Sequence, residues 1–311
     1  MLSVVYQSNP PSELVIIDQC QDNSVYLILQ DIIKQARLDF PFIYVQTGVK
    51  GLVHAKALAA KLFNSDVLVF GEDDMFFSPN YFETILCAFS LYPSLMGLSG
   101  LIDEPPFTMS QKLRHFFTNY FPLLKDDRQL ASRSPSGFNQ ILFSPKLYGG
   151  SSAWRREVFQ SVAFEPNLIL HFTEDIFFSH KVNSVYGTSS TALLPCIKSI
   201  HNSETNLRRF DPLIYRQKLY EELHFVKTFS SSFAFRFRDS VVLVLLRLAE
   251  AVLLAPLTSK PLLFLSLFSA LIDSIYGFYP FQTIYNGPVN LAVVMSPSSQ
   301  LTNNCAVEDD T

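Results

Sequence analysis

Short apolar runs alternate with helical segments in the N-terminal third of the chain, and this alternation restricts the fold more than any other feature. Residues 14–17, 42–45 and 67–70 are apolar runs of a length suited to strands buried on both faces. Residues 24–38 and 53–63 lie between them and carry apolar side chains at helical spacing. Such alternation is typical of an α/β domain with parallel strands flanked by helices.

Carboxylates follow two of these runs. Asp18 comes directly after the first, and Glu72, Asp73 and Asp74 follow the third. Three adjacent acids repel one another and resist leaving water, so they need a compensating partner or stay solvated. Ligands of open α/β sheets bind outside the carboxyl ends of strands, so we expect Asp18 and the triplet to share one crevice. The triplet favours a divalent cation with a phosphorylated ligand, and a solvated acidic turn is the alternative.

The middle of the chain predicts further elements around a long irregular segment. We expect helices at 79–89, 110–121, 154–159 and 171–182, and strands at 95–102 and 193–200. Residues 103–145 are too long for an idle connection and predict a segment that covers a substrate.

Charge and cysteine content argue against two classes of function. The net charge of −4 and the pI near 5.9 give no electrostatic footprint for nucleic acid. The four cysteines are scattered without CxxC spacing, so neither a zinc site nor a disulfide framework is indicated. A reduced, cytosol-facing location fits this cysteine usage.

Four motifs resemble, in the same order, those of family 2 glycosyltransferases, which are nucleotide-sugar enzymes with a mixed α/β fold called GT-A. ELVIIDQCQDN resembles the strand and aspartate that contact the nucleotide, and GLVHAKALAAKLFNSDVLVFGEDD resembles the glycine, basic helix and strand before the DxD motif. YGGSSAWRREVF resembles a small-residue loop and helix, and TEDIFFSHKV resembles the Glu-Asp motif that carries the catalytic base. The resemblance implies a GT-A-like catalytic domain over residues 1–225.

The resemblance assigns the central roles to Asp175, Asp74 and His201. Asp175 is the implied general base, a carboxylate that accepts the proton of an acceptor hydroxyl. Two ordinary acids in a helix first turn are the alternative, because the helix dipole favours them there. Asp74 and His201 are the implied ligands of Mg²⁺ or Mn²⁺, which bridges diphosphate oxygens. A surface role is the alternative for the histidine.

The remaining implied site residues bind the two substrates. Those at the acceptor are Glu174, Trp154 and Gly150. Those at the nucleotide sugar are Asp18, Glu72 and Asp73. Trp154, the only tryptophan, is expected to stack on a sugar face or to pack in the core. Glu72 stands where the family has its first aspartate, which is a departure from the motif.

Two further departures concern the rest of the family pattern. The family opens with one more strand and helix, and Met1 falls near the end of the corresponding first helix. We therefore expect about one β-α unit to be absent, because the true start lies upstream or because the chain is a degraded copy. No Gln-x-x-Arg-Trp motif follows, which disfavours a processive polymer synthase.

Residues 226–285 are far more apolar than the rest of the chain. Pro256 interrupts them, and Arg247, Glu250 and Asp273 lie inside, so neither half offers the roughly 20 apolar residues that span a bilayer. We expect helices lying in the membrane interface, with core helices or a transmembrane pair as alternatives. The Ser, Asn and Pro content of residues 286–311 predicts a disordered tail.

The sequence therefore predicts a metal-dependent, inverting glycosyltransferase that moves a sugar from a nucleotide-diphosphate donor to a hydroxyl of a saccharide or lipid-linked acceptor. We expect it at the cytoplasmic face of a membrane, peripheral or monotopic, held through residues 239–280 and serving surface polysaccharide or glycolipid assembly. A truncated, inactive homologue acting as a membrane-bound binding or scaffold protein is one alternative. A nucleotidyltransferase is less favoured, because no glycine-rich basic phosphate loop is visible near the first strand.

Overall fold

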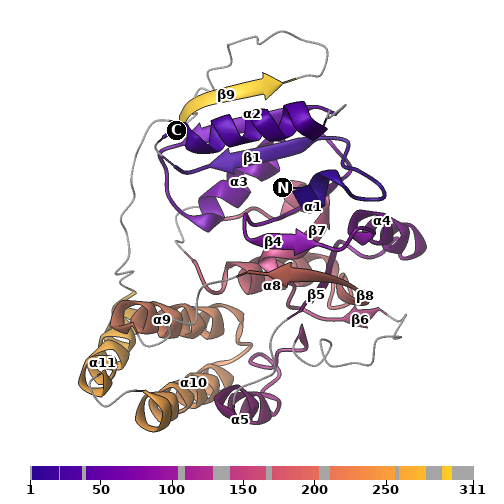
Figure 1. Cartoon of the computed structure of the whole chain (residues 1–311). Coiled ribbons are helices and arrows are strands. Elements are labelled where there is room, and N and C mark those ends of the chain that lie inside the picture. Colours follow the sequence, from indigo (N-terminus) through magenta and orange to yellow (C-terminus); the bar gives the residue numbers. More distant parts are fainter. Residues whose placement is uncertain are drawn as a thin grey trace.

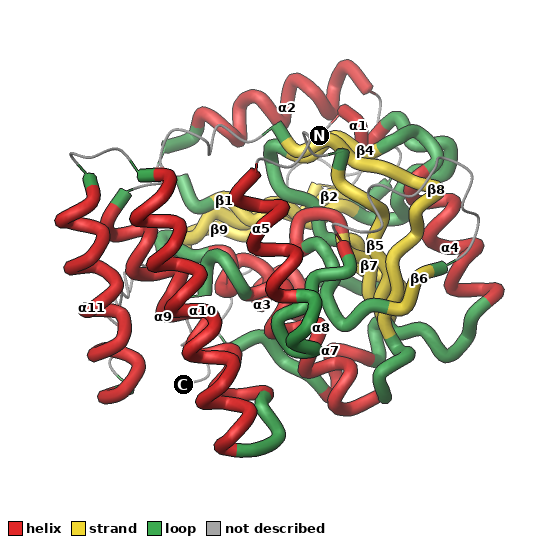
Figure 2. The backbone as a smooth tube through the Cα atoms, turned by 90° about the horizontal axis from the view of Figure 1, so that it is seen from below, coloured by secondary structure: helices red, strands yellow, loops and turns green. Residues whose placement is uncertain are grey.

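The computed structural model describes residues 2–20, 22–36, 40–103, 109–128, 141–165, 170–202, 211–255, 259–277 and 289–295. In this part of the chain two sheets with flanking helices form an α/β body, and a group of helices lies beside it (Figures 1 and 2). The prediction of a mixed α/β fold with a C-terminal apolar helical appendage is confirmed.

The smaller sheet has the strand order β1-β2-β9. Its elements are β1 (Leu14–Asp18), α2 (Ser24–Ala36), β2 (Phe42–Thr47) and β9 (Val289–Met295). The parallel pair β1 and β2 follows the predicted pattern, with α2 covering Phe42 and Tyr44 through Leu29.

The predicted disorder of residues 286–311 is wrong for β9, which pairs antiparallel with β2. The run VNLAVVM is rich in β-branched residues, which suit a strand, and it supplies hydrogen-bond partners to the free edge of β2. The prediction missed this strand because it relied on the composition of the whole segment, which is dominated by the polar residues on either side of the run. Residues 286–288 and 296–311 lie outside the described residues.

The larger sheet is mixed, with the order β3-β7-β5-β8-β4 and β6 pairing with β8. Its strands are β3 (Val67–Val69), β4 (Met75–Phe77), β5 (Gly97–Ile102), β6 (Leu142–Phe143), β7 (Ser152–Arg155) and β8 (Thr191–His201). Only β5 and β8 run parallel; the other pairs are antiparallel. The strand that carries the acidic triplet therefore belongs to a different sheet from β1 and β2.

Two local predictions differ from the larger sheet. Met75–Phe77 forms β4 directly after the acids, where no strand was expected. The helix expected at 154–159 begins as β7, and only α7 (Val158–Ser161) is helical. β7 lies between β3 and β5 and is hydrogen-bonded to both, so two ladders hold these residues extended.

Helices cover the larger sheet and enclose the main core. They are α1 (Leu2–Val5), α3 (Leu52–Leu62), α4 (Tyr81–Leu91), the 3₁₀ turn η1 (Gly149–Ser151) and α8 (Glu174–Tyr186). The core includes the fully buried Tyr81, Ile85, Leu98, Leu147 and Val182. Burial of such large apolar side chains is the main stabilising contribution to this layer.

The C-terminal helices form a separate bundle. Its members are α9 (Pro212–Phe229), α10 (Phe233–Leu254) and α11 (Lys260–Tyr276), with α5 (Met109–Thr118) packed beside α10. The expected domain boundary after residue 225 falls inside α9 and stays a prediction. Within the described ranges, no helix combines the length and the apolar content that crossing a membrane requires.

A buried carboxylate joins this bundle to the segment that precedes α8. Glu221 of α9 is fully buried and accepts hydrogen bonds from the backbone N–H groups of His171, Phe172 and Thr173, at 3.0, 2.8 and 3.0 Å. Burial raises the pKa of Glu221, and these donors act against that rise. The residues that precede α8 are thereby held on α9, and the first turn of α8 is positioned with them.

Candidate active site

The acidic triplet meets His201 through a strand pairing. Asp74 immediately precedes β4, and β4 pairs antiparallel with β8 so that Met75 lies opposite His201. The Nε2 atom of His201 is 3.0 Å from Oδ2 of Asp74, and the backbone N–H of Asn202 donates to the carbonyl oxygen of Asp74. The β4–β8 ladder therefore brings together two side chains that are distant in the sequence.

Glu72, Asp74 and His201 form a cluster able to hold a divalent cation. One potential ligand atom from each lies within 4.8 Å of the others. Oδ1 of Asp74 is shielded from solvent and accepts no hydrogen bond within the described part of the chain, so it is available to a ligand. Two carboxylates and an imidazole suit Mn²⁺, and a Mg²⁺ ion would use the oxygens. Asp73 is exposed between the two other acids.

A buried lysine connects this cluster with α8. Lys56 of α3 places its Nζ 2.5 Å from Oε1 of Glu174 and 3.5 Å from Oε1 of Glu72. Burial acts to lower the pKa of Lys56, but the carboxylates of Glu174 and Glu72 outweigh it, and the pKa lies above its usual value. The lysine is thus a charged bridge between the two acidic motifs. The sequence marked its helix as basic but did not single out Lys56, whose burial depends on α8.

Replacing Lys56 with Met should lower the free energy of unfolding by about 3–5 kcal/mol, because it leaves the buried carboxylate of Glu174 without a cation. Urea denaturation followed by circular dichroism measures the loss. Lys61→Met is the matched control, since Lys61 lies exposed on the same helix and should change stability by less than about 0.5 kcal/mol. Equal stability of the two variants would contradict the bridging role.

Two glycines allow the backbone of η1 to approach this bridge. A Cβ atom at Gly149 would lie 2.5 Å from Oε1 of Glu174 and 2.7 Å from Nζ of Lys56, and one at Gly150 would lie 2.9 Å from Cδ of Glu72. Such distances exclude any larger residue unless the bridge moves. Gly150, which the sequence assigned to the acceptor, lies against Glu72. Its role at the acceptor stays a prediction.

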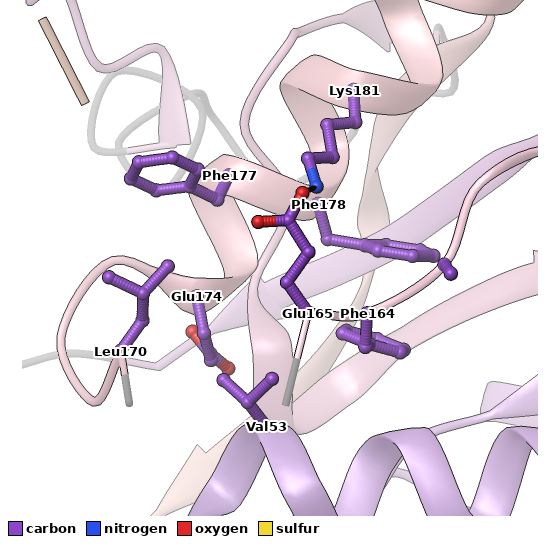
Figure 3. Close-up of a pocket in the computed structure, with 9 residues that line it drawn as sticks. Val53, Phe164, Glu165, Leu170, Glu174, Phe177, Phe178 and Lys181 are labelled. Atoms are coloured by element: carbon purple, nitrogen blue, oxygen red, sulfur yellow. Dashed lines mark hydrogen bonds and ion pairs between the residues drawn. The ribbon is translucent and has the colours of Figure 1, made fainter. Parts of the chain in front are cut away.

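Glu174 and Asp175 occupy the first turn of α8, where the helix dipole favours negative charge. Glu174 is buried beside Lys56. It also lines a mainly apolar pocket together with Val53, Leu170 and Phe177 (Figure 3). Burial raises the pKa of Glu174, and Lys56 acts against this rise. The expected helix that begins at these acids is confirmed.

Asp175 is held by Arg128, a residue of the long segment 103–145 that the sequence analysis did not identify as a site residue. Nη1 of Arg128 lies 2.6 Å from Oδ2 of Asp175, while Oδ1 accepts the backbone N–H of Ile176 at 2.7 Å. Both oxygens of the Asp175 carboxylate are therefore oriented, and each retains a lone pair.

Arg128 is itself fixed on three further sides. Its Nε and Nη2 donate to the two oxygens of Asp126 at 3.0 and 2.8 Å, and Nη1 donates to the carbonyl oxygen of Leu147 at 3.0 Å. The guanidinium lies 5.1 Å from the ring centroid of Tyr148. Although burial opposes its charge, Asp126 and Asp175 hold the pKa of Arg128 well above its usual value. Asp175 is therefore paired with an arginine whose position is fixed by other contacts, and not with a mobile surface cation.

Asp18 belongs to the smaller sheet, whereas the strands that carry this cluster belong to the larger one. Asp18 ends β1 in the smaller sheet, where it is buried and accepts hydrogen bonds from the Tyr44 hydroxyl at 2.5 Å and the Cys20 N–H at 2.8 Å. Its role at the nucleotide stays a prediction.

Trp154 is 2% exposed, so its expected stacking on a sugar face is wrong. It lies opposite Gly97 in the β5–β7 ladder, and its ring fills the space above that glycine. Its indole N–H donates to Oγ of Ser152 at 2.9 Å, and Phe178 packs against the ring. Trp154 is a core residue, as its alternative interpretation held.

Comparisons with known proteins identify the family and the fold. A family model described as "Glycosyl transferase family 2" matches residues 1–159. The mannosyltransferase PcManGT from Pyrobaculum calidifontis, solved with GDP-Man and Mn²⁺, is similar in fold, with a TM-score of 0.54 and 12% identity over 89% of this chain and 83% of that one.

Two structures of S. aureus TarS, both of residues 1–349, are also similar in fold. The first has a TM-score of 0.52 and 12% identity, covering 89% of this chain and 77% of that one. The second, in complex with UDP-GlcNAc, has a TM-score of 0.51 and 10% identity over 89% of this chain and 84% of that one. No significant match was found among curated protein sequences.

Proposed function

Because the chain belongs to glycosyltransferase family 2, we propose that it moves a sugar from a nucleotide-diphosphate donor to a hydroxyl acceptor with inversion at the sugar carbon. The observation that carries this proposal is a succession of neighbouring charged side chains. It runs from His201 and Asp74 through Glu72 and Lys56 to Glu174, whose chain neighbour is Asp175. This succession supports a single site at which the cation-binding candidates and the candidate base act together.

The donor belongs at the acidic corner. Asp74 and His201, with Glu72 beside them, would hold Mn²⁺ or Mg²⁺, and the unpartnered Oδ1 of Asp74 fits such a ligand role. When bound, the cation neutralises charge on the diphosphate leaving group. Sugars linked to GDP or UDP are the donor class we propose, because the similar structures contain GDP-Man and UDP-GlcNAc.

Asp175 is the proposed general base. The hydroxyl oxygen of the acceptor attacks the anomeric carbon, the bond from that carbon to the phosphate oxygen breaks, and the nucleoside diphosphate leaves. The hydroxyl proton passes to the Asp175 carboxylate. A single displacement inverts the configuration at the carbon. Arg128 orients the carboxylate for this transfer, and Lys56 holds Glu174 in place.

The acceptor we propose is a saccharide or a lipid-linked saccharide, used in surface polysaccharide or glycolipid assembly. We also propose that the protein works at the cytoplasmic face of a membrane as a peripheral or monotopic protein. Exposed apolar side chains on α10 and α11 support this location. Extracts of lipid-linked acceptors, incubated with a radiolabelled donor, test whether label enters the organic phase.

Replacing Arg128 with Met should lower kcat for transfer by about 10²-fold while the KM for the donor changes little, because the variant frees the Asp175 carboxylate from its productive orientation. Arg128→Lys keeps the positive charge but not the planar fork, so we expect partial recovery of kcat. Steady-state kinetics on both variants measures the two parameters. A rise in KM with unchanged kcat would show that Arg128 serves donor binding instead.

The decisive test of the proposed function uses the purified full chain with GDP-, UDP- and dTDP-sugars. We expect calorimetry to detect Mn²⁺-dependent binding of one donor class. We also expect slow hydrolysis of that donor, in which water takes the place of the acceptor and the nucleoside diphosphate is released. If none of the donors binds in the presence of Mn²⁺, the transferase proposal is wrong and the binding-protein alternative gains support. Binding without any release or transfer would place the chain among inactive homologues.

A further inference from the structure

The C-terminal bundle encloses several of its charged side chains. Arg247 of α10 is buried and pairs with Glu222 of α9 at 2.7 Å and with Glu250 at 2.9 Å, and Arg114 of α5 pairs with the same Glu222. Burial acts to lower the pKa of Arg247, but Glu222 and Glu250 outweigh it and raise that pKa. These ion pairs join three helices through one interior cluster.

Two more acids of α10 and α11 are also buried in ion pairs. Asp273 of α11 is 6% exposed and accepts two hydrogen bonds from Arg216 of α9, at 2.7 and 2.9 Å. Asp239 of α10 is 1% exposed and pairs with Arg238 at 2.7 Å. Every acid of α10 and α11 therefore has a cationic partner within the bundle.

The outward faces of the same helices are apolar. Between Val241 and Tyr276, every residue that the structure describes as exposed is aliphatic, aromatic or proline. The most exposed include Leu245, Leu253, Leu262, Leu265, Phe268 and Ile275. A helix that faces water shows the reverse arrangement, with charges outside and apolar residues inside. These faces are therefore unsuited to water.

Helix α5 packs beside α10 and also exposes aromatic side chains. Its Phe116 and Phe117, and Tyr120 just beyond it, are exposed, while Arg114 ties the helix to α9 through Glu222. Figure 2 shows α5 lying next to α10, in agreement with their contacts. The guanidinium of Arg238 lies 5.0 Å from the ring centroid of Phe121. Aromatic side chains of the N-terminal domain thus lie beside the C-terminal helices.

The charge exposed next to this surface is positive. Lys227 and Arg238 are exposed and Arg236 is half-buried, close in the chain to the exposed Phe233 and Phe237. Cations interleaved with aromatic rings are typical of segments that lie among anionic lipid headgroups. A symmetric contact with a second copy would bring these cations against one another, because each side presents the same patch.

We propose that α5, α10 and α11 together form a docking face for an anionic lipid bilayer, with the helices lying in the interface rather than crossing it. This refines the membrane location proposed above and does not depend on the transfer reaction. Residues 109–128 carry both α5 and Arg128, so docking of α5 also fixes the segment that holds Asp175.

Vesicle sedimentation with the full chain tests this docking face without any substrate. We expect binding to phosphatidylcholine vesicles that contain phosphatidylserine, and about tenfold weaker binding to phosphatidylcholine alone or at high salt. Leu245→Glu and Phe268→Glu should each lower binding to the anionic vesicles about tenfold or more, because a carboxylate replaces an apolar side chain that would lie in the bilayer interface. Phe117→Ser should weaken binding as well, through α5.

Leu91→Glu is the matched control, since Leu91 is 70% exposed and its helix α4 lies away from α10 and α11 in Figures 1 and 2. It should bind vesicles like the unaltered chain. Wild-type binding by Leu245→Glu and Phe268→Glu, with unchanged thermal unfolding, would overturn the proposal. So would a dimer that forms without lipid, dissociates in these variants and binds no vesicles, because the face would then join two copies of the chain. Unchanged binding by Phe117→Ser would remove α5 from the face.

Discussion

Replacing Asp175 with Asn should lower kcat for sugar transfer by about 10²–10⁴-fold while the affinity for the nucleotide-sugar donor stays nearly unchanged. The amide has the shape of the carboxylate but cannot take the proton of the acceptor hydroxyl. Its oxygen can still accept a hydrogen bond from Arg128, which retains Asp126 as a charged partner. The variant should therefore fold and bind the donor.

Steady-state kinetics and donor titration by calorimetry measure the two quantities for Asp175→Asn. Asp103→Asn is a suitable control, because Asp103 is an exposed acid at the end of β5 and should leave both nearly unchanged. Wild-type turnover by the Asp175 variant would remove this residue as the base and direct attention to Glu174. A large loss of donor affinity would instead assign Asp175 to donor binding.

Replacing Asp74 with Ala should abolish the part of donor binding that depends on Mn²⁺. We expect the donor affinity measured with Mn²⁺ to fall by more than about 100-fold. Loss of a residue that only supports a metal ligand already lowers metal affinity by up to about 100-fold, and Asp74 is itself a proposed ligand. The variant removes Oδ1, which lacks a hydrogen bond in the described structure, and Oδ2, which faces His201. The remaining Glu72 and His201 leave too few ligands for a stable site.

Calorimetric titration of the donor with Mn²⁺ and with a chelator separates the two parts of binding for Asp74→Ala. In the unaltered chain the chelator should weaken binding, whereas in the variant it should have little further effect. Asp103→Ala again provides the control for removing an exposed acid near the same sheet. Unchanged affinity of the Asp74 variant in the presence of Mn²⁺ would contradict its role as a metal ligand.

The sequence by itself determined those parts of the fold that depend on neighbours along the chain. The strand-helix alternation through β3 and the start of α8 at Glu174 follow from residue spacing and from acids at a helix N-terminus. The acids after β3 also indicate one corner of the site through their position at the end of an apolar run. Such features are readable because the period of a helix or strand and the preference of its ends are local.

Only the tertiary structure decided which distant residues complete the site. β4 is three residues long, and its ladder with β8 is what places His201 beside Asp74. Lys56 and Arg128 carry no local sign of function, because a lysine or arginine becomes a charged bridge only when acids from other elements surround it. The pairing of strands, and the partner that a buried charge meets, are set by contacts across the fold, and so they cannot be read from the spacing of residues along the chain.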